Sequence, residues 1–472
     1  MTQSFPLSRL LTLHSLVIVL GLGVYVLTSH VRRQRRSPAA AITWVVSLSL
    51  IPYIALPIYF FFGNRKAIRA QGTLPIDDKF VAYAGTDSLV IRFQQLAASM
   101  GLPQPSTYST FELHQDGRSA LAALLAVIQG ARTSLSVCTF LLGNDVVGEE
   151  VQQALIARAQ AGVKVRLLID GVGFYLGGSP RLKRLSAAGV DVALFVSPLR
   201  SALEGRTNLR NHRKFAIADG WRVWCGGRNI AAEYFSGDLA VAGKSVPWVD
   251  LSFDMEGTLA GSTLEQFDRD WAFSTQTPFV AKLGAEKAKA GPECEAKAQL
   301  IPSGPDQTDD TVYSLLVTSC FTAQSHIRIC TPYFVPDSTL LMALTLGARR
   351  GVSVDLLVPQ QSNHWLADVA RHVALRELCL AGGRVWMFPQ MIHAKVVVID
   401  DQLALAGSAN LDERSLFLNY ELMIAFFEGK EIERFAVWIG QQMHLASSYI
   451  PLKPGLIGEL KEGLVRSVAF QL

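Results

Sequence analysis

The sequence lacks the cysteine pairs that would indicate a disulfide framework or a zinc site. Its six cysteines are scattered over 472 residues, and no two are spaced as Cys-x-x-Cys. We therefore expect them to be small, buried hydrophobic residues. A chain of this length has room for two or three domains.

Acidic residues are also missing from one end of the chain. Residues 1–70 contain eight Lys or Arg and no Asp or Glu. The rest of the chain therefore has 36 of the 44 basic residues against 40 acidic ones, a net charge of −4. Proteins that work along DNA or RNA usually carry a basic footprint, so this balance argues against a nucleic-acid partner.

Two stretches near the N-terminus lack formal charge altogether. Leu10–Thr28 has 19 such residues and Ser37–Gly63 has 27, and each is long enough to cross a hydrocarbon core of about 30 Å. The segment between them, SHVRRQRRS, is basic and has no small-residue cleavage site, which disfavours a signal peptide. Residues 1–70 are therefore predicted to form a two-helix transmembrane hairpin. Four basic residues flank it on either side of the membrane, so the positive-inside rule does not decide its orientation.

Beyond the hairpin the chain repeats itself. QALIARAQAGVKVRLLIDG (Gln153–Gly171) has a counterpart in LMALTLGARRGVSVDLLVPQ (Leu341–Gln360), and both indicate a helix, a glycine stop and a buried strand. LKRLSAAGVDVALF (Leu182–Phe195) corresponds in the same way to LRELCLAGGRVWMF (Leu375–Phe388). Alternating helices and strands predict parallel α/β sheets in two similar units. The expected division is a hairpin over 1–70, a connector over 71–107, repeats over 108–290 and 291–450, and a tail over 451–472.

Each repeat ends in the same motif, His-x-Lys-x4-Asp followed after six residues by Gly-(Gly/Ser)-x-Asn. It occurs in NHRKFAIADGWRVWCGGRN and again in IHAKVVVIDDQLALAGSAN. The motif residues are His212, Lys214, Asp219, Gly227 and Asn229 in the first copy and His393, Lys395, Asp400, Ser408 and Asn410 in the second. Two matches at equivalent places in a duplicated chain are not explained by ordinary residue usage.

The motif residues suit the chemistry of a phosphodiester. One histidine can attack phosphorus while the other protonates the departing oxygen. Lys214 and Lys395 can neutralise the phosphate oxygens, and Asn229, Ser408 and Asn410 can donate hydrogen bonds to them. Because the lysines supply the positive charge, we expect neither a metal ion nor another cofactor to be needed.

Carboxylates can orient the two catalytic imidazoles. Glu421, 28 residues after His393, and Asp250, 38 residues after His212, are expected to do so, each within its own repeat. Asp219 and Asp400 end the motif strands, where they are expected to act either as catalytic anchors or as turn residues.

The doubled motif resembles the phospholipase D superfamily. More closely, the chain resembles bacterial cardiolipin synthases over about residues 10–450. The resemblance rests on the N-terminal hairpin and on two stretches, RNHRKFAIADGWRVWCGGRNIAAEYF and IHAKVVVIDDQLALAGSANLDERSLFLNYE. The resemblance implies an α/β pseudo-dimer of two phospholipase D-like repeats in the bacterial cytoplasmic membrane. It also implies a phosphatidyltransferase that converts two phosphatidylglycerol molecules into cardiolipin and glycerol through a phosphatidyl-histidine, with no protein partner known. Gly227, where serine is common in the superfamily, leaves Ser408 without a symmetric counterpart.

Other functions use the same residues. A membrane-anchored phosphodiesterase, a lipase or a nuclease, would take water as the acceptor, and a lipid-binding scaffold would perform no chemistry. The net charge of −4 argues against the nuclease, and two complete motifs argue against the scaffold. His212 is taken as the nucleophile and His393 as the acid and base, although the symmetry of the repeats allows the reverse.

Overall fold

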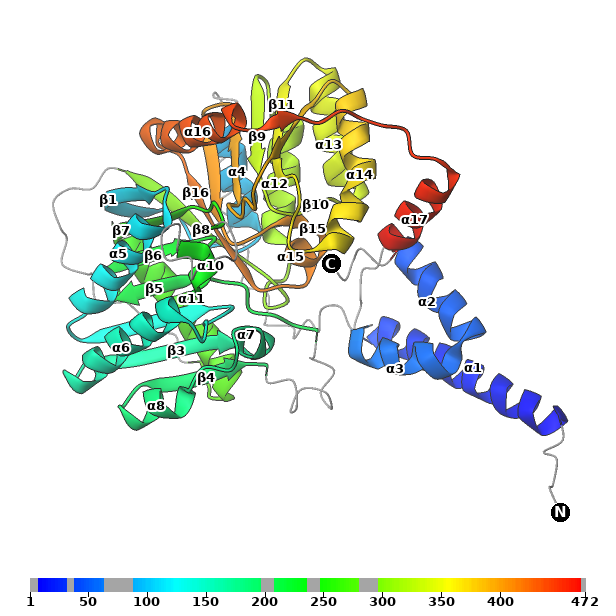
Figure 1. The fold of residues 1–472 in the computed structure, drawn as a ribbon, viewed down its shortest axis with the longest axis horizontal. Coiled ribbons are helices and arrows are strands. Elements are labelled where there is room, and N and C mark those ends of the chain that lie inside the picture. The colour runs from blue at the N-terminus through cyan, green and yellow to red at the C-terminus, as the bar shows by residue number, and fades with distance from the viewer. Residues whose placement is uncertain are drawn as a thin grey trace.

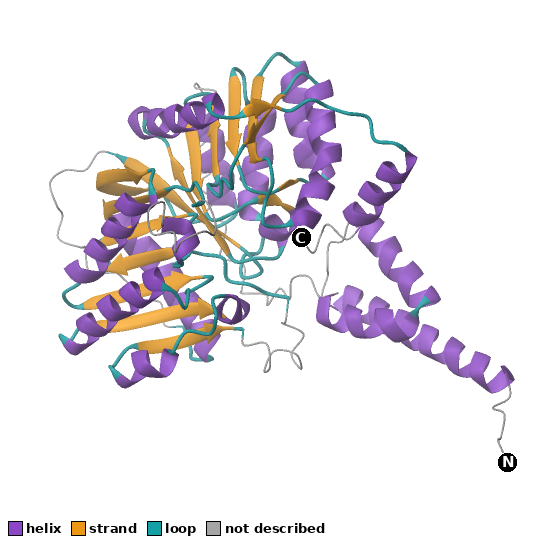
Figure 2. Cartoon of the chain, in the orientation of Figure 1, coloured by secondary structure: helices purple, strands orange, loops and turns teal. Residues whose placement is uncertain are grey.

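One long mixed sheet, flanked by helices, forms the body of the protein (Figure 1, Figure 2). The computed structural model describes residues 7–31, 38–62, 88–196, 208–235, 247–279 and 296–467. Within these residues the sheet has 15 strands in the order β17-β12-β11-β9-β13-β14-β16-β8-β1-β7-β6-β5-β2-β3-β4. The two halves meet between β1 and β8, and from there outwards their strands follow one another in equivalent order. This order is β1-β7-β6-β5-β2-β3-β4 in the first half and β8-β16-β14-β13-β9-β11-β12 in the second, which confirms the duplication.

The strands of the two halves have similar lengths. Those of the first half are β1 (Ser106–His114), β2 (Ser134–Thr139), β3 (Lys164–Asp170), β4 (Asp191–Phe195), β5 (Phe215–Ala218), β6 (Arg222–Gly226) and β7 (Ser252–Gly257). Those of the second are β8 (Lys297–Ser303), β9 (His326–Cys330), β11 (Ser353–Pro359), β12 (Arg384–Phe388), β13 (Val396–Ile399), β14 (Leu403–Gly407), β16 (Glu421–Phe426) and β17 (Ser447–Ser448). A separate two-stranded sheet pairs β10 (Phe334–Val335) with β15 (Leu411–Asp412).

The expected parallel sheet is only partly correct. Strands β2-β3-β4 and β9-β11-β12 run parallel, and the helix before each outer strand ends in a glycine of positive φ, as the repeats predict. The motif strands β5-β6-β7 and β13-β14-β16, however, run antiparallel. A short turn joins the first two strands of each group, and so short a connection can only reverse the chain.

Helices cover both faces of the sheet. Those of the first half are α5 (Gly117–Gly130), α6 (Val146–Gln160), α7 (Gly171–Leu176), α8 (Leu182–Ala187), α10 (Ala232–Phe235) and α11 (Thr258–Thr275). Those of the second are α12 (Thr311–Thr322), α13 (Ser338–Arg349), α14 (Trp365–Leu380), α15 (Glu413–Phe417), α16 (Gly429–His444) and α17 (Leu456–Ser467). Helix α4 (Leu89–Ser99) precedes the first repeat but packs against α12 of the second.

The two halves share one hydrophobic core. Strands β1 and β8 pair antiparallel through Ser106 with Ala298 and Thr107 with Lys297, which makes the sheet continuous. The core at this junction includes Phe111 and Phe253 from the first half and Phe426 and Phe435 from the second. Separate cores lie under the outer helices of each half. The halves are therefore joined by burial as well as by hydrogen bonds.

The N-terminal helices project from this body (Figure 1). They are α1 (Leu7–Val31), α2 (Pro38–Leu50) and α3 (Pro52–Phe62). The second expected span is therefore broken, because Pro52 has no N–H to continue a helix and disfavours helical geometry at Ile51. Among the described residues, no helix is both long and apolar enough to cross a bilayer. The expected transmembrane hairpin thus stays a prediction.

Candidate active site

The two motifs meet at one end of the antiparallel strands. His212 and Lys214 come just before β5, Asn229 comes just after β6, and Asp250 comes just before β7. Because these strands alternate in direction, the starts of β5 and β7 and the end of β6 lie at the same edge of the sheet. The second repeat gathers its own motif residues in the same way around β13, β14 and β16.

Each histidine is paired with the carboxylate of the other repeat. Nδ1 of His393 lies 2.8 Å from Oδ2 of Asp250, and Nδ1 of His212 lies 3.2 Å from Oε1 of Glu421. The predicted pairing within each repeat is therefore wrong, although the two carboxylates are the ones expected. The second contact is longer and is not aligned as a hydrogen bond, so the His393 pair is the tighter one.

Backbone pairing between the repeats explains the exchange. The His393 N–H donates to the carbonyl of Val249, the residue before Asp250, at 2.6 Å. The His212 N–H likewise donates to the carbonyl of Tyr420, the residue before Glu421, at 2.8 Å. Each histidine segment thus runs parallel to the carboxylate segment of the other repeat. Neither repeat alone contains a complete histidine–carboxylate pair.

Both imidazoles are held neutral. The pKa of His212 is lowered to about 4, mainly by burial and next by the charge of Lys214. The pKa of His393 is lowered to about 3, mainly by burial and next by the charge of Lys395. Lys395 also acts on His212 and Lys214 on His393, so the charges of both repeats act within one site. A neutral imidazole with its Nδ1 facing a carboxylate can use its other nitrogen as a nucleophile or base.

The two lysines lie beside their own histidines. Nζ of Lys214 donates to the carbonyl of His212 at 2.5 Å, and Nζ of Lys395 lies 2.7 Å from Nδ1 of His393 and also donates to the carbonyl of that residue. Burial lowers the pKa of Lys214 to about 8 and that of Lys395 to about 7. A bound phosphodiester anion would favour the charged form of both lysines.

The carboxylates remain ionised despite complete burial. Burial alone would raise the pKa of Asp250, but the neighbouring His393, Lys395 and Arg228 hold it below its ordinary value. Burial would likewise raise the pKa of Glu421, and His212, Lys214 and Ser408 together lower it. Each histidine is therefore next to a negative charge that can stabilise an imidazolium when one forms.

The residues expected to bind phosphate differ in what they contact. The Ser408 hydroxyl donates to Oε2 of Glu421 at 2.6 Å, so its proton serves the carboxylate and the expected bond to phosphate is not supported. Asn229 and Asn410 are buried, and the side-chain oxygen of each has no hydrogen-bond partner. The Asn229 amide donates to the Tyr234 hydroxyl at 2.8 Å. The unpaired atom of each asparagine is an acceptor, so a hydrogen bond to a phosphate oxygen has to come from the amide NH2 group.

The glycine at position 227 is explained by its neighbour. A Cβ atom there would lie 2.3 Å from Oδ1 of Asp250, far inside contact distance. In the second repeat the equivalent Ser408 fits, and its hydroxyl binds the carboxylate. The first repeat combines glycine with aspartate and the second combines serine with glutamate.

Asp219 and Asp400 lie away from the histidines, beyond the far ends of β5 and β13. Asp219 accepts backbone hydrogen bonds from Arg132, Thr133 and Ser134, at the start of β2. Asp400 does the same for Gln324, Ser325 and His326, at the start of β9. The structure therefore favours the turn role over the catalytic one for both.

Two buried arginines were missed by the sequence comparison. Arg213 donates to the carbonyl of Glu421 at 3.0 Å, and Arg228 donates to the carbonyl of Asp250. Each thus holds the backbone of a histidine-orienting carboxylate. Both lie inside the first motif, but Ala394 and Ala409 occupy the equivalent positions in the second. A comparison of the two motifs keeps only shared residues, so neither arginine stands out in it. The signal for them in the sequence is a charged residue inside an otherwise buried motif.

Aromatic rings enclose the histidines. The Phe140 ring packs edge-on against His212 at 4.8 Å, and Tyr234 packs edge-on against His393 at 5.1 Å, measured between ring centroids. Trp248 lies 5.4 Å from His393. These rings reduce solvent access, which strengthens the electrostatic interactions within the site.

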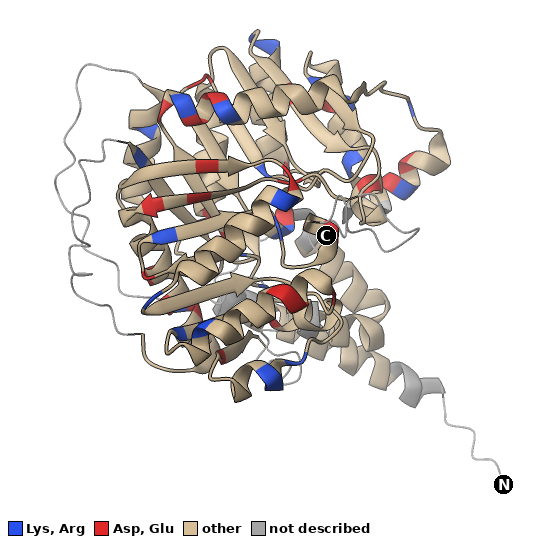
Figure 3. Ribbon diagram, turned by 60° about the vertical axis from the view of Figure 1, so that its left-hand side comes forward, with Lys and Arg blue, Asp and Glu red and all other residues tan. Residues whose placement is uncertain are grey.

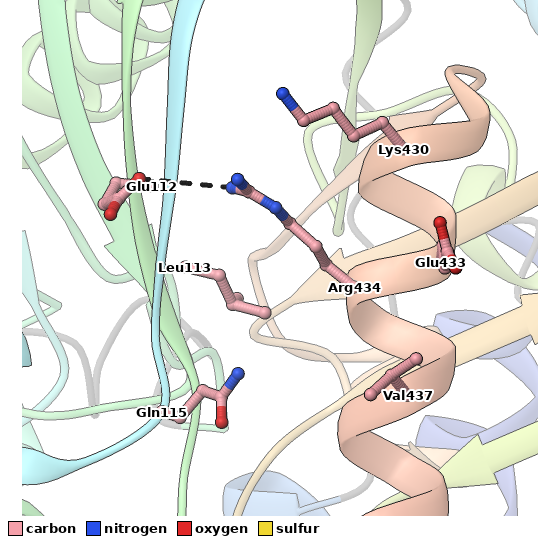
Figure 4. A pocket seen from close by; sticks show the side chains of 7 residues that line it. All are labelled: Glu112, Leu113, Gln115, Lys430, Glu433, Arg434 and Val437. Atoms are coloured by element: carbon pink, nitrogen blue, oxygen red, sulfur yellow. Dashed lines mark ion pairs between the residues drawn. The ribbon is translucent and has the colours of Figure 1, made fainter.

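Among the described residues, neither a metal-binding cluster nor the pocket between β1 and α16 coincides with this site. No group of three or more His, Cys, Asp or Glu side chains among the described residues is arranged to hold a metal ion. A shallow pocket of 360 Å³ lies elsewhere, between β1 and α16 (Figure 4). Its charged residues include Arg434, which lies 4.0 Å from Glu112. The pocket contains none of the motif residues.

A duplicated α/β fold with two His-x-Lys motifs meeting across the repeats defines the phospholipase D-like class. A family model described as "Cardiolipin synthase, PLD-like domain" matches residues 124–242 and 318–443. The chain belongs to this cardiolipin synthase family of phospholipase D-like proteins.

Individual relatives agree with this assignment. "Cardiolipin synthase A" of Pseudomonas putida is 31% identical over 82% of this chain and 83% of its own length. "Cardiolipin synthase 1" of Bacillus anthracis is 28% identical over 84% of this chain and 82% of its own. The solved structure of a phosphatidylserine synthase from Haemophilus influenzae matches 82% of this chain and 100% of its own, with a TM-score of 0.60 and 14% identity. That structural likeness concerns the fold alone.

Proposed function

We propose that the protein is a cardiolipin synthase, which transfers a phosphatidyl group from one phosphatidylglycerol to another and releases glycerol. The observation that carries the proposal is the pair of neutral histidines, each facing the carboxylate of the other repeat, with two lysines beside them. Two such histidines suit a reaction that breaks one phosphodiester bond and makes another. The relatives' names supply the product, cardiolipin.

In the first step, Nε2 of His212 attacks phosphorus while His393 protonates the leaving glycerol oxygen. One N–P bond forms, one P–O bond breaks, and a phosphatidyl-histidine remains. His393 can carry the proton because a bound phosphodiester anion offsets the charge of Lys395, and Asp250 then favours the imidazolium. Lys214, Lys395 and the amide groups of Asn229 and Asn410 bind the phosphate oxygens.

In the second step, neutral His393 takes the proton from a head-group hydroxyl of another phosphatidylglycerol. The oxygen of that hydroxyl attacks phosphorus, the N–P bond breaks and His212 departs, which leaves His393 protonated for the next cycle. Water in place of the lipid hydroxyl would give phosphatidic acid, the product of a phospholipase D. The enclosed, aromatic surroundings of the histidines favour a lipid acceptor over water.

The N-terminal helices are proposed to anchor the enzyme in the bacterial cytoplasmic membrane as two spans, the second bent at Pro52. Helices α2 and α3 contain no charged residue, and Figure 3 shows them without blue or red segments. Large apolar side chains on all three helices are exposed, among them Leu20, Leu50 and Ile54 at 59%, 70% and 59%. An apolar surface of this kind is unfavourable in water and suits lipid.

Product analysis tests the function. The purified full-length protein, incubated with phosphatidylglycerol vesicles, should form cardiolipin and glycerol in equal amounts, as measured by mass spectrometry. His212→Ala and His393→Ala should abolish both products, whereas His326→Gln, which changes a histidine paired with Asp401 outside the site, should not. Formation of phosphatidic acid without cardiolipin would instead establish the phospholipase D activity.

A further inference from the structure

Helix α17, near the C-terminus, has two faces of different character. Leu456, Ile457 and Leu460 are 75%, 83% and 67% exposed, and their spacing places them on one side of the helix. Val465 is buried on the opposite side. A surface helix of a water-soluble domain normally turns such an apolar stripe inward, and here the stripe points outward.

The inner face of α17 is fixed to the second repeat. Arg376 of α14 makes two hydrogen bonds to Glu462 of α17, one of them 3.0 Å long between Nη1 and Oε1. Val465 packs with Val335, Ala367 and Ala370. The outward direction of the apolar stripe is therefore set by packing and a bidentate ion pair rather than by a frayed helix end.

The apolar stripe continues into neighbouring apolar surface. The segment leading into α17 exposes Ile450 and Leu452 at 73% and 74%. Helix α17 also contacts the uncharged helix α2, beside which it lies in Figure 1, and α2 exposes Ile42 at 63%. These elements, far apart in sequence, form an apolar surface that includes the proposed membrane anchor.

From this continuity we infer that α17 lies along the surface of an anionic phospholipid bilayer, with Leu456, Ile457 and Leu460 in the lipid. The inference rests on the proposed function, which requires lipid substrates and an N-terminal anchor. Exposed Lys453 and Lys461 suit anionic head groups and lie near the stripe, and the exposed Glu459 lies at its other edge. A short amphipathic helix is a common means of holding a protein domain on a membrane.

The contact also positions the catalytic site. Val335, which packs against α17, belongs to β10, and β10 pairs with β15, which directly follows Asn410. One side of the second motif is therefore connected to the lipid-facing helix through a single pair of short strands. A bilayer under α17 would hold the site at the level of the head groups, where both phosphatidylglycerol substrates are confined.

A fluorescent probe on α17 tests the inference in the full-length protein. Cys294 and Cys379 are first replaced by serine, and NBD is then attached to Ile457→Cys or, as the matched control at the charged edge of the stripe, to Glu459→Cys. In phosphatidylglycerol vesicles with brominated acyl chains, the probe at 457 should be blue-shifted and quenched several-fold more than the probe at 459. Equal, weak quenching at both positions would overturn the inference, as would a blue shift without quenching, which indicates contact with a second copy.

A second variant links the contact to catalysis. Leu456→Asp/Leu460→Asp should reduce turnover of bilayer phosphatidylglycerol on the order of tenfold, because two apolar side chains no longer enter lipid. Turnover of short-chain phosphatidylglycerol below its micelle concentration should remain unchanged, and equal loss on both substrates would contradict the inference. Absence of cardiolipin from the parent protein in the same vesicles would mark failure of the proposed function instead.

Discussion

At the scale of single residues, the most informative feature is the exchange of carboxylates between the two repeats. Asp250 faces His393 and Glu421 faces His212, although each is closer in sequence to the other histidine. The two pairs also differ in their surroundings. Asp250 lies against Gly227, whereas Glu421 accepts hydrogen bonds from Ser408 and Asn419.

The exchange predicts which variants behave alike. Asp250→Asn and Glu421→Gln should each lose about 10- to 100-fold in kcat/KM, because an amide favours the wrong tautomer of its histidine. Phosphatidyl-p-nitrophenol has a leaving group that needs no protonation, so it should rescue the first step, measured as release of p-nitrophenolate, in the variants that impair the general acid. Asp250→Asn should then be rescued together with His393→Ala, while Glu421→Gln and His212→Ala should not recover. Rescue of Glu421→Gln alongside His393→Ala would contradict the exchange and support pairing within each repeat instead.

The lysines predict an alkaline limit on activity. Burial lowers the pKa of Lys395 to about 7 and that of Lys214 to about 8. Each is charged below its pKa, so the free enzyme loses its affinity for the phosphodiester as the pH rises through this range. We expect kcat/KM, which reports the free enzyme, to fall between about pH 7 and pH 9. Lys395→Arg should move this fall in kcat/KM to higher pH, because arginine stays charged there. A flat profile for the wild type would contradict the role given to the lysines.

At the scale of elements, buried Arg213 holds the segment before β5 onto β16. It donates to the carbonyls of Glu421 and Ser303 at 3.0 Å each and pairs with Asp270, which is also buried. The segment carrying His212 and the strand carrying its carboxylate are therefore fixed by one side chain. A planar guanidinium can reach these partners together, and an ammonium cannot.

Replacement of this arginine should therefore have two separable effects. Arg213→Met should destabilise the fold by about 3–5 kcal/mol, because the buried Asp270 carboxylate loses its cationic partner and keeps only hydrogen bonds from the neutral Asn211 and Gln266. Arg213→Lys should keep more stability but lose kcat with little change in KM, since the Glu421 backbone is no longer held. Arg222→Met is the matched control, because Arg222 is one-third exposed and pairs with Asp254 away from the site. Thermal melts and kinetics on the three proteins measure both effects, and full activity of Arg213→Lys would exclude a positioning role.

At the scale of the whole molecule, the two repeats form a single catalytic unit. The sheet is continuous through β1 and β8, and each histidine–carboxylate pair takes one member from each half. One chain therefore contains both pairs and needs no residue from a second copy to complete them.

This arrangement predicts the result of mixing two inactive variants. Full-length His212→Ala and His393→Ala, purified separately and combined in the same vesicles, should not recover cardiolipin formation. Each chain lacks one catalytic histidine, and the shared core prevents exchange of halves between folded chains. As a control, each variant should retain the melting temperature of the wild type to within a few degrees. Recovery of a substantial fraction of activity on mixing would show that the site forms between chains.

The sequence alone determined the duplication, the helix–glycine–strand units, the two motifs and the identities of both carboxylates, because these depend on local periodicity and on comparison of the chain with itself. Only the tertiary structure decided which carboxylate faces which histidine, since that depends on the parallel backbone pairing of His212 with Tyr420 and of His393 with Val249. It also revealed Arg213 and Arg228, which have no counterpart in the second motif, and redirected Ser408 from phosphate to Glu421. These contacts join residues up to 209 positions apart, as in His212 and Glu421, and no local pattern encodes a pairing at that distance.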